Sequence, residues 1–586
     1  MMRVRGGKAA SSETARWERL ILWGIVVLAV VLRAWGLSHQ LPDKTYIEED
    51  EFIYTALKYG SGDPNPHWFF HPPLYSYLLF ALYGAYYLLG AAAGWFRGAE
   101  EFILQYLVDP SAFYIIARGL SVLLSVPAVL LLHRFGRNVC SPRVGLAACL
   151  LFAVMPLGVK YAHYGCTEPL LLCLVLAAAV CAARALQTGR VRPLLAAGAF
   201  AGAAMGTKYT GAFALALVAA AVPPPTRVSS WAALLGAFAA AGAAFLLVCP
   251  FPILAPQEFA ANVSLLASQP LQVGEYSWQR IPNLYLEFAR RHMPVGMTAP
   301  LAWISLAGTV FLWLRHRRED ILVAALPTAF YLVIGRSRLF YDRYMLVCYP
   351  FFALAAAALL DAAAARAAGL LAPAAARPRR AAALLAAAAV ALALGGAGAS
   401  ARLVRLMVLP ETRFLAARWI EEHLPAEARI LADDAPVPQT EESVRREQRL
   451  KEREPRQEFG YREKTGLYFD LQRRAARGRR GFDVTRILHP RGFHMLGGGR
   501  GYEEEWMTPE RMKAQLESID DYDYVLASST GAYRYRAREI LPERFRFLHD
   551  FYAGLAGRGT VVKVFRPEPS RSTGPEYTLY RVGEGR

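Results

Sequence analysis

Long apolar runs broken by short polar loops dominate the first two thirds of the chain. The runs are about 17 to 22 residues long, which matches the length that an α-helix needs to cross a bilayer. We therefore predict a polytopic α-helical membrane protein with about 11 transmembrane helices. The predicted spans are residues 20–37, 113–132, 144–161, 169–186, 194–207, 210–222, 231–249, 295–314, 321–335, 345–360 and 381–400.

Two stretches leave the number of crossings open. The segment 74–96 is apolar enough to span, but a crossing there would place Arg134, Arg137 and Arg143 outside the cell. Its tyrosines and Trp95 instead suit a helix in the aromatic belt of the outer interface. The two short runs 194–207 and 210–222 have a single long tilted helix as their alternative.

The positions of the basic residues predict the orientation. With 74–96 at the interface, the Arg-containing loops 134–143, 184–192, 315–318 and 366–380 lie on the same side as the basic N-terminal residues 1–19. The positive-inside rule assigns that side to the cytoplasm. The first apolar run is then a retained signal anchor. We expect a multi-pass protein of the cell membrane, with a first extracytoplasmic loop at 38–112 inside a transmembrane domain at 20–400.

The tail at 401–586 is polar and is predicted to be a soluble extracytoplasmic α/β domain. Its pattern indicates a helix at 412–423 and strands at 429–432, 522–528 and 560–565. The stretch 441–480 is rich in Arg and Glu, which fits either a mobile linker or an insert near lipid headgroups.

Composition excludes two other classes of protein. The net charge of +18 comes from arginines between apolar runs rather than from one basic face, so it indicates topology and not a nucleic-acid partner. Seven cysteines fall mostly within apolar runs and show no CxxC spacing, which argues against disulfides and against a zinc site.

An acidic run, Glu48-Glu49-Asp50-Glu51, follows the first predicted span. Thr45 opens a capping box, so a short helix is expected at 46–59, ending at Gly60. Glu48 and Glu49 are explained as first-turn acids that complement the helix dipole. Asp50 and Glu51 are explained less well in that way, and fixed carboxylates at a membrane mouth usually have a task there. We interpret Asp50 and Glu51 as catalytic candidates.

Two further outward loops carry titratable groups. His71 precedes Pro72 and Pro73, which set an extended turn, so it is either a substrate contact or a structural residue. In the loop 161–169, His163 and Glu168 add an imidazole and a second acid. Capping of the next helix is the alternative explanation for Glu168, because Pro169 suits a first helical position.

Cations at the outward side suggest an anionic ligand. Lys208 lies between apolar stretches and must reach water, a phosphate or a carboxylate, and snorkelling to the interface is its simplest explanation. The predicted substrate-binding set also includes Arg118, Arg336, Arg338, Arg343 and Tyr344. Arginine forks suit phosphate oxygens. No GxxxxGK[ST] or GxGxxG loop marks a nucleotide site, so the activated group is expected to arrive on a lipid.

Together these motifs resemble the GT-C glycosyltransferases, in particular the protein O-mannosyltransferase and lipid A aminoarabinose transferase group. The resemblance covers about residues 15–360. It rests on the order of Asp50-Glu51, His71-Pro72-Pro73-Leu74-Tyr75, Ala117-Arg118-Gly119-Leu120, His163 with Glu168, Gly206-Thr207-Lys208-Tyr209, and Arg343-Tyr344-Met345 leading to Tyr349-Pro350. Two positions depart from the family pattern: Glu168 replaces the more common Asp, and His163 stands where Arg is often found.

The resemblance implies inverting transfer of a sugar from a polyprenyl-phosphate donor to a protein, lipid or glycan acceptor. Asp50 would be the base or a carboxylate near a metal, with Lys208 and Arg343 stabilising the departing phosphate. A divalent metal cation held by Asp50 and Glu168 is an option, and no nucleotide cofactor is expected. The alternative from another class is a multi-pass lipid or solute transporter, because intramembrane charge also marks transport paths.

Overall fold

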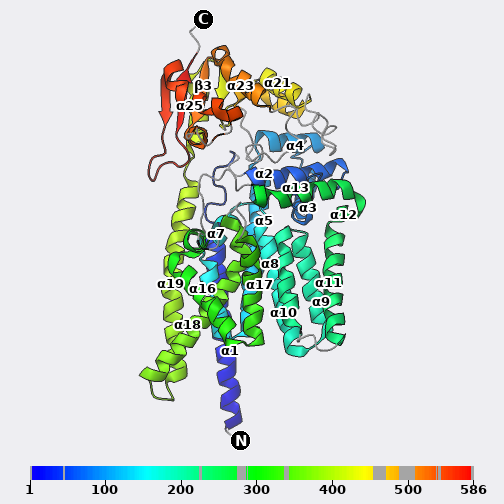
Figure 1. Ribbon diagram of the computed structural model, residues 1–586, viewed down its shortest axis with the longest axis vertical. Helices are drawn as coiled ribbons and strands as arrows, with labels where there is room; N and C mark the ends of the chain where they lie inside the picture. The colour runs from blue at the N-terminus through cyan, green and yellow to red at the C-terminus, as the bar shows by residue number, and fades with distance from the viewer. Residues whose placement is uncertain are drawn as a thin grey trace.

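The structure is a computed structural model, which describes residues 3–43, 47–222, 228–272, 286, 288–335, 342–433, 435–452, 470–487, 508–535, 538, 541 and 543–582. A bundle of long helices carries a layer of shorter helices at one end, and a domain with a β-sheet lies beyond that layer (Figure 1). The N-terminus lies at the opposite end of the bundle from the sheet.

The bundle contains α1 (Arg3–Ala34), α5 (Ser111–Val139), α8 (Glu168–Thr188), α9 (Val191–Met205), α10 (Leu215–Ala221), α11 (Val228–Val248), α16 (Ala299–Arg315), α17 (Arg318–Ile334), α18 (Tyr349–Leu371) and α19 (Arg377–Val408). Within the described residues, six helices are long and apolar enough to cross a membrane, or up to eight if each bent pair is one span. A multi-pass helical protein is confirmed, whereas the predicted count of about 11 crossings is not.

Two of the predicted spans are broken into bent helix pairs. The segment 144–161 forms α6 (Pro142–Ala153) and α7 (Pro156–Ala162), which meet at 62°. Pro156 has no backbone N–H to continue α6, and Arg33 Nη1 instead donates to Ala153 O at 2.7 Å. The segment 295–314 is likewise divided between α15 (Met293–Met297) and α16, in a helix pair bent by 118°.

The stretch 194–222 is two elements rather than one long tilted helix. After α9, the chain breaks at Thr207 and Lys208 and continues as a 3₁₀ turn, η2 (Tyr209–Ala214), into α10. The glycines of α9 allow close packing against α11, since a Cβ on Gly198 or Gly202 would lie 2.0 Å from a carbonyl oxygen of α11. The break places Lys208 in the turn just after the end of α9.

Short helices form the layer between the bundle and the sheet domain: α2 (Ile47–Lys58), α3 (Leu74–Ala92), α4 (Ala99–Val108), α12 (Phe251–Leu254) and α13 (Pro256–Gln272). The predicted helix at 46–59 is present as α2, and a 3₁₀ turn, η1 (Tyr59–Ser61), ends it at Gly62, where φ is 87°. Thr45 lies outside the described residues. Although α3 is long enough to span, Figure 1 groups it with α2, α4 and α13, so its interfacial position stays a prediction.

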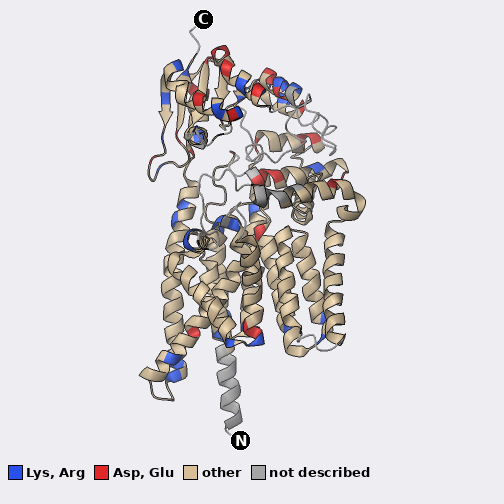
Figure 2. Cartoon of the chain, in the orientation of Figure 1, with Lys and Arg blue, Asp and Glu red and all other residues tan. Residues whose placement is uncertain are grey.

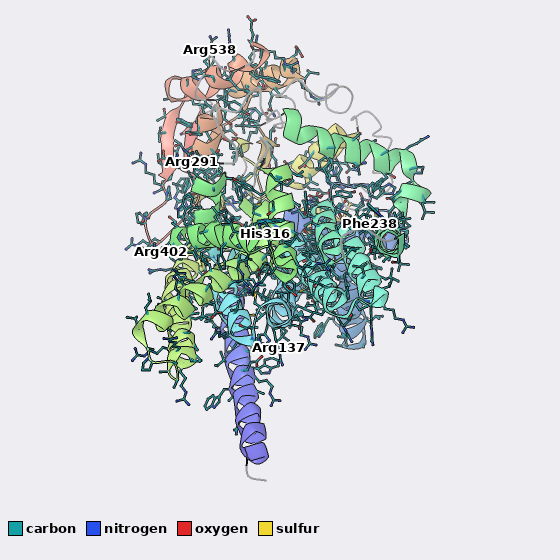
Figure 3. All side chains as sticks on the ribbon, turned by 60° about the horizontal axis from the view of Figure 1, so that its bottom comes forward. Arg137, Phe238, Arg291, His316, Arg402 and Arg538 are labelled. Atoms are coloured by element: carbon teal, nitrogen blue, oxygen red, sulfur yellow. The ribbon has the colours of Figure 1, made fainter. Side chains whose placement is uncertain are left out.

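Charged residues gather at the two ends of the bundle. Figure 2 shows Lys and Arg, together with some acidic residues, at the end near the N-terminus, and acidic residues of α2 as well as further Lys and Arg toward the other end. Arg137 lies against α1 (Figure 3), where its Nη1 is 3.4 Å from Glu18 Oε1. Basic residues near the N-terminal end are what the positive-inside rule expects of a cytoplasmic N-terminus, and the orientation itself remains a prediction.

The C-terminal domain contains a five-stranded sheet in the order β2-β1-β3-β5-β4. Its strands are β1 (Arg429–Ala432), β2 (Asp483–Arg486), β3 (Tyr524–Ser528), β4 (Thr560–Phe565) and β5 (Tyr577–Arg581), and its larger helices are α20 (Thr412–His423), α21 (Glu441–Glu452), α23 (Pro509–Glu517) and α25 (Arg546–Arg558). Strands β2, β1 and β3 are parallel, and β5 pairs antiparallel with both β3 and β4. The predicted helix at 412–423 and strands at 429–432 and 560–565 are confirmed.

Parts of the domain differ from the prediction. Strands β2 and β5 were not predicted, and β3 begins two residues later than the predicted 522–528. The start of the segment 441–480 is α21, whose Arg446 forms a two-point pair with Asp483 of β2 at 2.6 and 2.8 Å. That part is packed on the sheet rather than a linker, and 453–469 lies outside the described residues.

Candidate active site

The four acids of α2 have different surroundings, because successive positions on a helix point in different directions. Glu49 is fully buried and binds Arg118 of α5 at two points, with Nε to Oε1 at 2.8 Å and Nη2 to Oε2 at 2.9 Å. The Gly165 N–H donates to Glu49 Oε1 at 2.7 Å. This ion pair fastens α2 to α5 and to the loop before α8.

The guanidinium donors of Arg118 are used mainly in contacts within the protein. Its Nη1 also donates to Leu37 O at 2.8 Å and to His39 O at 3.0 Å, and its side chain has no exposed area. The structure therefore does not support the predicted role of Arg118 in holding a lipid headgroup. A guanidinium with five donors and a fork geometry suits this bracing position.

Asp50 lies on the next position of α2 and is partly buried. Its Oδ1 accepts from the Tyr106 hydroxyl of α4 at 2.5 Å and from the Tyr114 hydroxyl of α5 at 3.0 Å. Two phenol donors from different helices fix the orientation of one carboxylate. A fixed carboxylate at the end of a membrane bundle is a suitable base or charge stabiliser.

A second group of charges brings distant loops together. Lys208 Nζ lies 2.6 Å from Glu168 Oε1 at the start of α8. Arg343, in the 3₁₀ turn η4 (Asp342–Cys348), places its Nε 3.8 Å from the same oxygen and pairs with Glu48 of α2 through Nη2. Lys208 and Arg343 are each about nine-tenths buried. We name Glu48, Glu168, Lys208 and Arg343 the ion cluster.

Glu51 and His71 border this cluster. Burial, followed by repulsion from Glu48, raises the pKa of the Glu51 carboxyl to about 7, while a hydrogen bond from Trp68 and the charge of Arg343 oppose the shift. Burial, and then the Lys208 cation, lowers the pKa of His71 to about 3, so its imidazole is neutral. The His71 ring packs edge-on against Phe52 with centroids 5.0 Å apart.

The remaining predicted residues divide into three groups. Both ring nitrogens of His163 face backbone carbonyl groups: Nδ1 lies 2.8 Å from Val159 O and Nε2 lies 2.8 Å from Trp35 O. The structure therefore indicates a structural role for His163 rather than a substrate contact. Tyr344 places its ring 5.9 Å from Lys208 Nζ, beside the ion cluster. Arg336 and Arg338 lie outside the described residues.

The residues do not fit the suggested metal site. Glu168 already faces Lys208 and Arg343, and a divalent cation beside two cations would be repelled. The structure also shows no group of three or more His, Cys, Asp or Glu side chains able to hold a metal, within the residues it describes. We derive no step through a metal ion.

Sequence reasoning missed several side chains of the site. Tyr106 and Tyr114 orient Asp50, Trp68 bonds Glu51, and Glu48 belongs to the ion cluster instead of only complementing a dipole. The tyrosines carry no local signal, because aromatic residues are common at membrane interfaces.

Residues 114–254 match the family model described as dolichyl-phosphate-mannose-protein mannosyltransferase. The matched stretch includes Arg118, Glu168 and Lys208 and ends before Arg343. It covers less than half of the chain. No curated protein matches the chain in sequence.

Solved structures show the fold. ArnT from Cupriavidus metallidurans bound to undecaprenyl phosphate is 13% identical, with a TM-score of 0.51 over 97% of this chain and 99% of that chain. Its apo state is 14% identical, with a TM-score of 0.50 over 98% and 100%. At these identities the likeness shows the fold alone, which is the GT-C fold. Together with the family match, this fold agrees with the resemblance to the GT-C glycosyltransferases that the sequence motifs carry.

Proposed function

We propose that the protein transfers a sugar from a polyprenyl-phosphate donor to an acceptor hydroxyl or amine on the extracytoplasmic side of the cell membrane. The observation that carries the proposal is the ion cluster beside Asp50's helix. Two nearly buried cations, Lys208 and Arg343, meet there at the end of an apolar bundle. Buried cations in such a place are expensive unless they serve a ligand or a path.

The cluster suits a phosphate on a lipid. The carboxylates of Glu168 and Glu48 neutralise Lys208 and Arg343 in the free protein, so the cations remain ionised at the membrane mouth without a ligand. An arriving phosphate competes for the same donors, and the Arg343 fork matches two of its oxygens. The similar structure of ArnT holds undecaprenyl phosphate, which supports a lipid-linked donor for this chain.

Asp50 is the proposed base. The oxygen or nitrogen atom of the acceptor attacks the anomeric carbon of the sugar, and the acceptor proton passes to Asp50. The bond from that carbon to the phosphate oxygen breaks. The polyprenyl phosphate leaves with its bonding electrons, and Lys208 and Arg343 stabilise the charge that builds on it. Attack opposite to the leaving group inverts the anomeric configuration.

Glu51 has a supporting role in this proposal. Because its pKa lies near neutrality, Glu51 gains and loses a proton easily near pH 7. Its bond to Trp68 links the acid to the loop that leads into His71 and α3. We assign Glu51 and His71 to the positioning of the donor or the acceptor, with Tyr344 beside Lys208.

A transfer assay tests the proposal. Full-length protein in lipid nanodiscs is mixed with polyprenyl-phosphate sugars that carry different labelled sugars, and release of polyprenyl phosphate is measured in the presence of a membrane extract as the source of acceptor. The test variant is Asp50→Asn. Glu101→Gln, which removes a carboxylate from an exposed pair with Arg97, is its matched control. Absence of both donor binding and release for every sugar would refute the proposal.

A further inference from the structure

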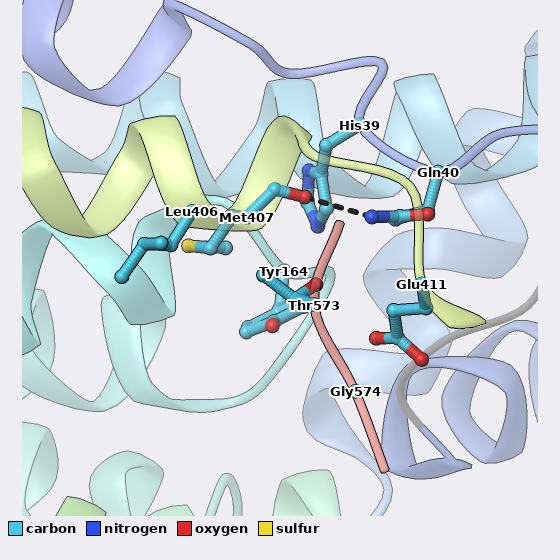
Figure 4. A pocket seen from close by; sticks show the side chains of 8 residues that line it. All are labelled: His39, Gln40, Tyr164, Leu406, Met407, Glu411, Thr573 and Gly574. Carbon is cyan, nitrogen blue, oxygen red and sulfur yellow. Dashed lines mark hydrogen bonds between the residues drawn. The ribbon is translucent and has the colours of Figure 1, made fainter. Parts of the chain in front are cut away.

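A cavity of about 260 Å³ lies where the C-terminal domain meets the membrane domain (Figure 4). The chain after α1 contributes His39 and Gln40, the loop before α8 contributes Tyr164, and the domain contributes Glu411 and Thr573. Because the lining comes from both domains, the cavity exists only while the two domains are docked. None of these residues belongs to the ion cluster.

One buried polar atom at this cavity has no hydrogen-bond partner among the residues that the structure describes. His39 is 4% exposed, and within that part of the chain its Nε2 makes no hydrogen bond, whereas Nδ1 lies 3.2 Å from Gly36 O and 3.3 Å from Arg118 Nη1. The ring extends toward Tyr164 and Thr573 (Figure 4). Leaving a buried ring nitrogen unpaired carries a desolvation penalty, which a hydrogen-bonding ligand would recover.

The charges at the cavity select the class of ligand. Burial, and then the Arg118 cation, lowers the pKa of His39 to about 3, so the imidazole is neutral there. Glu411 is the acid of the lining, and Arg413 pairs with it at 2.6 Å. The neutral imidazole and the Glu411–Arg413 pair give the lining no net positive charge to attract an anion such as a phosphate, while the imidazole and the carboxylate can exchange hydrogen bonds with hydroxyl groups.

The walls also provide an apolar side. Met407 and Leu406 of α19 line the cavity beside the polar groups. Gln40 Nε2 donates to Met407 O at 3.1 Å and also to Leu409 O, which holds the loop after α1 against the end of α19. A cavity with one apolar wall and a few convergent polar groups is typical of a small-molecule site.

We propose that this cavity binds a single neutral sugar unit, at a place separate from the ion cluster. The hydroxyl groups of a pyranose ring can pair with His39 Nε2, the Tyr164 hydroxyl and the Glu411 carboxylate, while the C–H face of the ring lies on Met407. None of these residues takes part in the proposed transfer reaction, and only the link of the site to a glycan acceptor or product rests on the proposed function.

The site is connected to the acids of α2. Arg118 contacts His39 through Nη1 and Glu49 through Nε and Nη2. A sugar bound to His39 would therefore lie next to Arg118, the residue that holds α2, the helix of Asp50. Such a site suits the sugar of a glycan acceptor or product held between the two domains.

Saturation-transfer NMR with methyl glycosides of several neutral hexoses tests the proposal. Full-length protein is placed in nanodiscs of phosphatidylethanolamine and phosphatidylglycerol, because sugar-based detergents would occupy the site. We expect saturable binding of at least one glycoside, unaffected by inorganic phosphate. Thr573→Phe fills the cavity and leaves in place the backbone hydrogen bonds of residue 573 to Pro410 and Thr412. Glu411→Gln removes the acid. Each should weaken binding about tenfold or more.

Glu421→Gln, on the exposed face of α20, is the matched control and should bind like the wild-type protein. Thermal unfolding reports whether Thr573→Phe folds, and Glu411→Gln decides if it does not. Saturable binding by no glycoside, equal binding by folded Thr573→Phe or by Glu411→Gln, or displacement by inorganic phosphate would each overturn the sugar assignment. The binding assay needs no transfer, so its failure is distinct from failure of the proposed function.

Discussion

The Glu49 carboxylate and the Arg118 guanidinium form a two-point ion pair in which neither side chain has any exposed area. Their positions in the chain are 69 residues apart, on a short interfacial helix and on a bundle helix. Breaking a buried ion pair leaves one charge without compensation, which costs more than the pair contributes while it is intact. The pair therefore serves as a brace for the helix that carries Asp50.

We predict that Glu49→Ala destabilises the protein by about 3 to 5 kcal/mol, because it leaves the Arg118 charge buried and unpaired. Thermal unfolding in nanodiscs measures the change. Glu101→Ala, in the exposed pair with Arg97, should shift the unfolding temperature very little. Equal shifts for the two variants would contradict a bracing role for Glu49.

Asp50→Asn should fold and insert normally but lower transfer by about 100-fold or more, since it preserves shape and removes the base. Tyr106→Phe keeps the carboxylate and removes one of its two donors, so a smaller loss of roughly tenfold is expected. The rate of labelled sugar transfer at saturating donor is measured for both. Transfer by Asp50→Asn at close to the wild-type rate would exclude Asp50 from the mechanism.

The raised pKa of Glu51 predicts a pH-dependent stability. The ordinary pKa of the carboxyl is 4.5, and in the folded protein it is about 7. Between these values the folded state binds more protons than the unfolded state, so stability falls as pH rises through this window. We expect the unfolding temperature to fall between about pH 5 and 7 more steeply in the wild-type protein than in Glu51→Gln. Parallel curves would show that Glu51 has no such shift.

Arg343 contacts Glu48 and Glu168, and its predicted task is to grip the donor phosphate. Arg343→Lys keeps the charge and loses the fork, so the donor KM should rise roughly tenfold while the acceptor KM changes little. Arg97→Lys, at a side chain that is 92% exposed, is the control. If Arg343 only anchors its helix at the interface, lysine substitutes freely and the donor KM stays constant.

Topology is tested by labelling single cysteines, in a background where the seven native cysteines are replaced. Arg97→Cys, after α3, should react with an impermeant thiol reagent in intact cells, and Arg190→Cys, between α8 and α9, should react only after lysis. Labelling of Arg190→Cys with protection of Arg97→Cys would mean that the segment 74–96 crosses the bilayer and that the later loops change sides.

Local patterns were sufficient for the elements themselves. The helix at 412–423 and the strands at 429–432 and 560–565 follow from periodicity and turn residues, which act over a few neighbours. The long apolar runs predicted a membrane bundle for the same reason. Strands β2 and β5 escaped prediction because each is short and is defined by its pairing with a distant strand.

The roles within the acidic run depended on the tertiary structure. Sequence alone predicted that Glu48, Glu49, Asp50 and Glu51 lie together at a membrane mouth, where fixed charge is costly. Their partners lie far along the chain, with Arg118 and Arg343 at separations of 69 and 295 residues. The packing of α2 against α4, α5 and η4 determines these roles. Glu49 pairs with Arg118 and holds α2 in place, Glu48 joins the ion cluster, and Asp50 accepts hydrogen bonds from two tyrosine hydroxyl groups. Such pairings depend on how helices meet in space, and no local propensity encodes that arrangement.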